Sequence, residues 1–266
     1  MSKRFYIVTD LEGVSGVDSW TQTRTAEAEF DSAANAAAKE QLASETNACI
    51  EGIHAVFPNA TVDILDGHGS GGLKADALSN GNYLRTPSFD PFERYEYEAQ
   101  LYVGQHAMAG MPFAPLNHTQ SSLHREYYRL NGTFIGEFAG GAIRAGLCGV
   151  PTVYLAGDDK AALEARMFVP DIETTVVKEG HGVQSASHVD PTTACDRIRT
   201  DTERAMQRID DIPPLTGFEP PYEMDIRFVE SDQALPERFR KPSVTAMWRD
   251  PHTLRLESET FTDVYP

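Results

Sequence analysis

The order of two kinds of segment along the first 200 residues restricts the possible folds most strongly. Short apolar runs at residues 5–9, 61–66, 99–105 and 151–157 alternate with longer runs of helix-forming residues, of which the alanine-rich segment 25–56 is the longest. Strands that alternate with helices form mostly parallel sheets whose faces the helices cover. We therefore predict an α/β domain over residues 1–212, with a mostly parallel sheet flanked by helices.

The pattern changes after the pair Pro213-Pro214. Segments 222–229, 244–248 and 253–257 alternate between apolar and polar residues with no helical run between them. Such alternation is typical of half-buried strands. We predict a smaller, β-rich C-terminal domain over residues 213–266.

Charge restricts the partners. The chain has 23 Lys and Arg against 40 Asp and Glu, a formal net charge of −17, which repels nucleic acid and anionic membrane surfaces. It has no apolar run of membrane-spanning length, and its first residues lead straight into a strand with no secretory signal. We expect a cytoplasmic protein that binds neither nucleic acid nor membranes.

Two carboxylates stand where the first apolar run ends. Residues two apart on an extended chain point the same way, so Asp10 and Glu12 should project into one crevice. No Lys or Arg lies between Thr9 and Thr23, so these acids need a proton or a cation from elsewhere. The simpler interpretation is a strand that merely ends in polar residues.

Other strand ends carry similar residues. His68 follows the run 61–66, His106 follows the run 99–105, and Glu137 follows a hairpin centred on Asn131-Gly132. Parallel strands place their carboxyl ends at one edge of the sheet, where ligands bind. Each residue alone is common in turns, but together they predict a site.

The residue types favour a pair of divalent ions. Three carboxylates and two neutral imidazoles around two such ions leave a net charge of about +1, which a bridging hydroxide would neutralise, whereas a single ion leaves surplus negative charge. Carboxylate and imidazole ligands without thiolate suit Zn²⁺ best, with Mn²⁺ or Co²⁺ as substitutes. Segments 9–18, 62–73 and 101–113 contain none of the Lys or Arg residues that phosphate sites commonly use, which favours a neutral amide substrate beside a free amino group.

These segments resemble the zinc-dependent D-aminopeptidase family of the DppA type. Residues 9–16, TDLEGVSG, resemble its S-x-D-x-E-G-x-x-G signature, and 66–68, 104–107 and 135–137 resemble its N-D-x-H, G-x-H-A and V-G-E segments. The resemblance implies five metal ligands: Asp10, Glu12, His68, His106 and Glu137. It also implies a ring-like homo-oligomer.

The same resemblance implies a catalytic histidine. Asn117-His118-Thr119 stands shortly after the G-x-H-A segment, where the family has its remaining catalytic histidine. His118 would then transfer a proton or act as a nucleophile.

Our hypothesis is a dinuclear zinc aminopeptidase that hydrolyses the N-terminal amide of short peptides, with D-residues implied by the resemblance. Two alternatives stay open: a metal-dependent amidohydrolase acting on a non-peptide amide, and a metal-stabilised binding protein without catalysis. The roles of four further residues also stay open. His181 and His188 stand in a loop after a strand and could approach the crevice, while Asp158 and Asp159 could approach the metals or cap the helix that follows.

Overall fold

The computed structural model describes residues 3–25, 29–85, 90–231 and 234–265. Its larger sheet has seven strands in the order β3-β2-β1-β4-β7-β8-β9. Their bounds are Arg4–Thr9 (β1), Thr61–Asp66 (β2), Asn82–Leu84 (β3), Ala99–Gln105 (β4), Thr152–Asp158 (β7), Glu173–Gly182 (β8) and Ser185–His188 (β9). Every neighbouring pair is parallel except β8 with β9. The prediction of a mostly parallel sheet is therefore confirmed.

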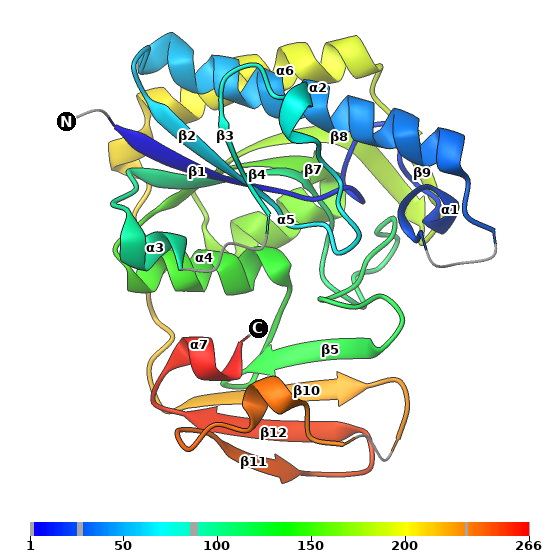
Figure 1. Ribbon diagram of the computed structural model, residues 1–266, viewed down its shortest axis with the longest axis vertical. Helices are drawn as coiled ribbons and strands as arrows, with labels where there is room; N and C mark the ends of the chain where they lie inside the picture. Colours follow the sequence, from blue (N-terminus) through cyan, green and yellow to red (C-terminus); the bar gives the residue numbers. More distant parts are fainter. Residues whose placement is uncertain (1–2, 26–28, 86–89, 232–233, 266) are drawn as a thin grey trace.

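Helices cover both faces of this sheet (Figure 1). The long helices α2 (Ser32–Val56) and α6 (Pro191–Gln207) pack against each other on one face. On the other face lie α3 (Pro91–Arg94), α4 (Glu137–Leu147) and α5 (Asp159–Phe168). All residues of β4 and β7 are buried, as expected for central strands of a sheet covered on both sides.

The helical run expected from residue 25 begins later than its composition suggests. The carboxylate of Asp31 accepts hydrogen bonds from the backbone N–H groups of Ala33 and Ala34 and so caps α2 at its first turn. Before this cap lies the one-turn helix α1 (Trp20–Thr23). Residues 26–28 of the expected run lie outside the described part of the chain.

The second sheet is antiparallel and has the order β11-β12-β10-β5-β6. Its strands are Arg125–Leu130 (β5), Thr133–Ile135 (β6), Tyr222–Phe228 (β10), Thr245–Trp248 (β11) and Thr253–Ser258 (β12), and the short helix α7 (Phe261–Val264) follows. The Asn131-Gly132 hairpin thus joins the C-terminal strands through β5 and β10. The second sheet therefore includes a segment from the middle of the chain, and the division at residues 212 and 213 stays a prediction.

The remaining regular segments are single 3₁₀ turns at Ala75–Ala77, Ile209–Asp211 and Glu237–Phe239. Among the residues that the structure describes, no helix combines the length and the apolar character needed to cross a membrane.

Strand order determines where a ligand can bind. β1 lies between β2 and β4, so the chain leaves β1 toward one side of the sheet and later returns to the other side. At such a switch point the loops after neighbouring strands separate and leave a crevice at the carboxyl edge. The residues that follow β1, β2 and β4 meet at this crevice.

Candidate metal centre

A close approach of two backbones fixes the loop that follows β1. Asp10 donates its N–H to the carbonyl of Val103 at 3.0 Å, and Gly13 donates to the carbonyl of Gly104 at 2.7 Å. A Cβ atom on Gly13 would lie 2.1 Å from the carbonyl oxygen of Gln105, so only glycine fits here. The D-x-E-G sequence is thus explained by geometry: the glycine lets the loop lie against β4 and keeps both acids in the crevice.

His68 and His106 enter the crevice from the two strands beside β1. His68 Nδ1 lies 3.2 Å from Asp10 Oδ1 and 3.0 Å from Glu12 Oε2. His106 Nε2 lies 3.1 Å from the other oxygen of Asp10. The two oxygens of Asp10 therefore face two different imidazoles.

Glu137 and His118 complete the cluster. Glu137 is the first residue of α4, where the positive end of the helix dipole favours a carboxylate. Its Oε1 lies 3.6 Å from His106 Nε2 and 3.7 Å from His118 Nε2, and it accepts the N–H of Gln120 at 2.7 Å. The rings of His106 and His118 stack with centroids 3.9 Å apart. All six residues predicted from the sequence thus lie together, although their roles stay predictions.

Backbone carbonyls fix the tautomer of each histidine. A carbonyl oxygen can only accept, so His106 Nδ1 donates to Ala107 at 2.8 Å and His118 Nδ1 donates to Leu116 at 3.0 Å. His68 uses its opposite nitrogen, Nε2, toward the carbonyl of Thr23 at 3.3 Å. Each neutral ring then turns its lone-pair nitrogen toward the carboxylates, and this is how metal-binding histidines are usually oriented.

Two buried atoms in the cluster have no hydrogen-bond partner of suitable geometry among the described residues. They are His106 Nε2, which lies 3.1 Å from Asp10 Oδ2, and Glu12 Oε2, which lies 3.0 Å from His68 Nδ1. A proton shared between such atoms needs a nearly linear arrangement, whereas a cation needs only lone pairs that converge. The arrangement of these side chains therefore suits coordination of a metal ion better than a hydrogen bond between them.

The carboxylates shift the pKa values of His68 and His106 upward, whereas burial and the neighbouring His106 lower the pKa of His118. Burial disfavours a charge on His68, but Glu12 and Asp10 outweigh it and raise the pKa of His68 to about 11. Burial of His106 is outweighed in the same way by Asp10 and Glu137, which raise its pKa well above the ordinary value. The carboxylates of the crevice therefore stabilise positive charge, which either protons or a metal cation can supply.

The structure brings the candidate ligand atoms within reach of shared ions. One group consists of His106, His118 and Glu137, and another consists of Asp10, Glu12 and His106. Within each group the ligand atoms lie no more than 4.8 Å apart. The family resemblance implies that His118 transfers a proton or acts as a nucleophile, and the geometry adds a further role to test, that of a ligand.

All four residues left open by the sequence have partners outside the metal cluster. Asp158 caps α5 by accepting the N–H groups of Lys160 and Ala161, which confirms the capping alternative. His181 Nε2 contacts the hydroxyl of Ser187 at 2.8 Å. His188 accepts the N–H of Gly16 at 3.0 Å and lies 3.3 Å from Asp18.

The fourth, Asp159, accepts the N–H of Gly180 at 2.9 Å and forms an ion pair with Lys160. It therefore ties the start of α5 to β8.

A buried lysine, which no sequence motif marks as part of the site, holds the loop that contains Glu12. Lys178, on β8, is 1% exposed and donates hydrogen bonds from Nζ to the backbone carbonyls of Glu12 and Val17. Burial lowers the pKa of Lys178 to about 8, although Asp158 partly offsets this. A lysine in a strand pattern gives no sign that its side chain reaches a loop more than 160 positions earlier.

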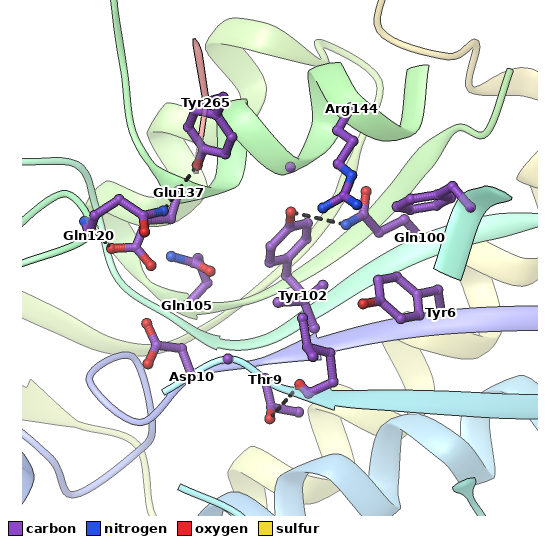
Figure 2. A pocket seen from close by; sticks show the side chains of 15 residues that line it. Tyr6, Thr9, Asp10, Gln100, Tyr102, Gln105, Gln120, Glu137, Arg144 and Tyr265 are labelled. Atoms are coloured by element: carbon purple, nitrogen blue, oxygen red, sulfur yellow. Dashed lines mark hydrogen bonds between the residues drawn. The ribbon is translucent and has the colours of Figure 1, made fainter. Parts of the chain in front are cut away.

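Two cavities share lining residues of the cluster. The main cleft has a volume of about 340 Å³ and is lined by Glu12, His68 and His118. The side cavity has a volume of about 180 Å³ and runs between α4 and the sheet (Figure 2). Asp10 and Glu137 line both, so the cluster stands at their junction.

Two further lining residues were not predicted. Arg24 lines the main cleft from the end of α1. Tyr265, near the end of the chain, lines the side cavity, and its hydroxyl accepts a hydrogen bond from Gln120 Nε2 at 3.3 Å (Figure 2). The sequence offers no local signal for either, because tertiary packing alone places them here.

Comparisons with known proteins agree with the fold and identify the family. The model of a peptidase family described as D-aminopeptidase matches residues 3–266. A D-aminopeptidase of Bacillus subtilis (strain 168) is 27% identical over 239 residues, which are 87% of this chain and 83% of that protein.

A solved structure shares the fold. It is that of the Zn-dependent D-aminopeptidase DppA from Bacillus subtilis, described as a self-compartmentalizing protease. The TM-score is 0.83 at 23% sequence identity, over 98% of this chain and 94% of that one. Because the family model spans nearly the whole sequence, the chain belongs to the D-aminopeptidase family of peptide hydrolases.

Proposed function

We propose that this protein is a zinc aminopeptidase that hydrolyses the amino-terminal amide bond of short peptides containing D-amino acids. Family membership supports the peptidase activity, and the names of the relatives support zinc and D-residues. The observation that carries the proposal is the meeting of three carboxylates with imidazole nitrogens whose tautomers direct lone pairs at them.

The arrangement around Asp10 favours two ions over one. Asp10 Oδ1 lies beside His68, which also contacts Glu12, while Oδ2 lies beside His106, which also approaches Glu137. Asp10 would then bridge two subsites with one imidazole and one further carboxylate each. With one zinc ion the three carboxylates leave a net charge of about −1, and with two they leave about +1, which one hydroxide ion would neutralise.

In the proposed hydrolysis, the side chains that hold zinc and the side chain of His118 have separate roles. Zinc, when bound, would polarise the scissile carbonyl and lower the pKa of an attacking water. Water adds to the carbonyl carbon, the C–N bond breaks, and the leaving nitrogen takes up a proton. His118 lines the main cleft and its Nδ1–H is held by Leu116, so its Nε2 can accept a proton from the attacking water and pass it to the leaving nitrogen.

Position distinguishes His118 from His106. The side chain of His106 is fully buried, whereas that of His118 is 13% exposed at the wall of the cleft. A residue that exchanges protons with substrate and solvent needs such access. We therefore propose that His118 moves protons and that the other five residues hold the ions.

His118→Ala tests this division. Turnover of a D-dipeptide should fall by about 10²- to 10⁴-fold, the usual contribution of a general acid or base, while elemental analysis still finds two zinc ions per chain. His124→Ala, in an exposed position of the same loop, is the control and should behave like the wild type. Loss of one zinc ion from the His118 variant would make His118 a ligand, and unchanged turnover would remove it from the mechanism.

A substrate panel tests the bond and the chirality. We expect hydrolysis of D-Ala-D-Ala, slower hydrolysis of L-Ala-L-Ala, and none of N-acetyl-D-Ala-D-Ala, because the free ammonium contributes to binding beside Asp10 and Glu137. Equal rates on the acetylated peptide would favour a non-peptide amidohydrolase. No turnover of any amide by zinc-loaded protein would favour a binding protein.

We also propose that the chain forms a homo-oligomer. The relative described as self-compartmentalizing supports this. A second support is Phe113, which is 68% exposed in the loop leading to His118 and has a φ of 60° that a bulky side chain rarely adopts. Light scattering should give a mass several times that of the chain, and Phe113→Asp should reduce it if this loop lies in the interface.

A further inference from the structure

The side cavity follows helix α4 away from the metal cluster. Glu137 is the first residue of α4, and Gly141 and Arg144 line the same cavity further along the helix. At a rise of about 1.5 Å per residue, they lie about 6 and about 10 Å beyond Glu137. A cavity of roughly 150 Å³ can hold a benzene ring. The side cavity of about 180 Å³ therefore has room for a side chain much larger than a methyl group.

Two tyrosines present hydroxyl groups to this cavity (Figure 2). The strand register places Tyr6 of β1 beside Gln100 of β4, and Tyr102 follows two residues after Gln100 on the same face of the sheet. The hydroxyl of Tyr102 lies against α4, because a Cβ atom on Gly141 would stand 1.9 Å from its oxygen. This hydroxyl is therefore about one helical turn beyond Glu137.

Both hydroxyl groups can donate a hydrogen bond to a ligand. Tyr102 accepts one from the amide of Gln100 at 3.1 Å, and its own hydrogen has no acceptor among the described residues. Tyr6 is 4% exposed, and no described residue forms a hydrogen bond with its hydroxyl. Burial raises the pKa of both phenols, so both keep this hydrogen at neutral pH. A ligand with an acceptor atom would satisfy both donors.

The charges around the cavity favour a neutral acceptor. Arg144 at the far end forms an ion pair with Asp90 at 2.5 Å, so its charge is already balanced. The acids Asp10 and Glu137 stand at the end beside the metal cluster. A carboxylate that entered the cavity would lose its hydration without gaining an unpaired cation among the described lining residues, and burial of such a charge is costly. A neutral carbonyl oxygen avoids this cost.

The sizes of the two cavities indicate the direction of the peptide. An aminopeptidase substrate has a single side chain before the bond that is cleaved and a chain of varying length after it. The side cavity of about 180 Å³ suits the single side chain, and the main cleft of about 340 Å³ suits the remainder. His118, which passes a proton to the leaving nitrogen, lines the main cleft, and this agrees with the same direction.

We propose that the side cavity binds the side chain of the amino-terminal residue and selects a neutral polar side chain of glutamine length, with Tyr6 and Tyr102 as hydrogen-bond donors. This inference rests on the proposed function and names its substrate class. Four bonds join the Cα of glutamine to its amide oxygen, a span of about 5 Å. A hydrogen bond of about 2.7 Å then reaches the hydroxyls, whereas the methyl group of alanine stays near the cluster.

The test compares three dipeptides whose first side chains have similar length and different ends. They are D-Gln-D-Ala, D-Met-D-Ala and D-Glu-D-Ala. Wild-type protein should hydrolyse D-Gln-D-Ala with a kcat/KM about 5- to 100-fold above that for D-Met-D-Ala, the range expected for two hydrogen bonds. D-Glu-D-Ala should be the poorest substrate of the three, because its carboxylate is buried without a partner.

Tyr6→Phe is the first variant, because it keeps the ring and breaks no hydrogen bond among the described residues. It should lower the ratio of kcat/KM for D-Gln-D-Ala to that for D-Met-D-Ala by about 2- to 10-fold, mainly through a higher KM for D-Gln-D-Ala. Tyr102→Phe should lower this ratio by a similar factor, and the double variant should bring it to within about threefold of one. Tyr127→Phe is the matched control, because Tyr127 lies on β5 and is not among the residues lining the side cavity. Its ratio should equal that of the wild type.

Four results would overturn the inference while leaving the peptidase function intact. Wild-type protein could hydrolyse D-Gln-D-Ala no faster than D-Met-D-Ala, or the preference could survive in the double variant. A preference for D-Glu-D-Ala would assign the selection to Arg144. An effect of the tyrosine variants on D-Ala-D-Gln in place of D-Gln-D-Ala would put the leaving residue in the side cavity. If zinc-loaded wild type hydrolyses no peptide at all, D-Ala-D-Ala included, the proposed function fails and this inference fails with it.

Discussion

Glu45, a buried carboxyl group away from the metal cluster, gives the protein a pH-dependent stability that can be measured. It lies on α2 with no exposed surface. One oxygen accepts the N–H of Ser15 at 3.0 Å and the amide of Gln41 at 3.1 Å, while the other has no hydrogen-bond partner among the described residues. Burial outweighs these hydrogen bonds and raises the pKa of Glu45 to about 7.

The sign and size of the effect follow from this shift. Between its ordinary pKa of 4.5 and about 7, the folded protein keeps a proton on Glu45 that the unfolded chain has released. The folded state then binds more protons, so the free energy of unfolding decreases as pH rises through this window. A difference of roughly 2.5 pKa units corresponds to about 3 kcal/mol lost between pH 4.5 and pH 7.

Glu45→Gln should abolish this loss, because glutamine keeps the acceptor oxygen and carries no charge. Urea unfolding of zinc-loaded protein should show the variant close to the wild type at pH 5 and more stable by about 3 kcal/mol at pH 8. Glu40→Gln, an exposed position on the same helix, is the control and should follow the wild type at both pH values. The reasoning would be refuted if the free energy of unfolding of Glu45→Gln changed with pH in the same way as that of the wild type between pH 5 and pH 8.

Three further outcomes follow from contacts near the site. Lys178→Met leaves the carbonyls of Glu12 and Val17 without their buried donor. The free energy of unfolding should therefore fall by about 3 to 5 kcal/mol, and the zinc content should decrease. Unchanged urea unfolding would contradict this prediction. Gly140→Ala places a Cβ 2.0 Å from Tyr265 Cζ, so the Tyr265 ring must move from its place in the side cavity. KM for a D-dipeptide should then change severalfold at constant zinc content. Unaltered kinetics would contradict the packing of Tyr265 against α4. Dialysis against a chelator should abolish activity and lower the melting temperature, and added zinc should restore both.

Much of the fold could be predicted because it depends on local patterns. The apolar runs that became β1, β2, β4 and β7 end in residues with special chemistry, and a parallel sheet brings such ends together whatever the details of its packing. Capping residues also have local signals, and Asp190 at the start of α6 accepts hydrogen bonds from the N–H groups of Thr192 and Thr193.

The rest depends on contacts between distant parts of the chain. The pairing of β5 with β10 joins residues about 100 positions apart, and the sequence of neither strand indicates which strand it pairs with. The same holds for Lys178, Arg24 and Tyr265, which reach the site only after the sheets and loops have packed. The three strand-end segments contain no Lys or Arg. Arg24, which lines the main cleft from the end of α1, lies outside those segments and was therefore not predicted.

The pair of zinc ions is the central claim, and anomalous diffraction at the zinc absorption edge tests it most directly. Crystals of zinc-loaded protein should show two peaks per chain. One should lie among Asp10, Glu12 and His68, and the other among Asp10, His106 and Glu137. A single peak, or peaks remote from the carboxylate of Asp10, would contradict the claim.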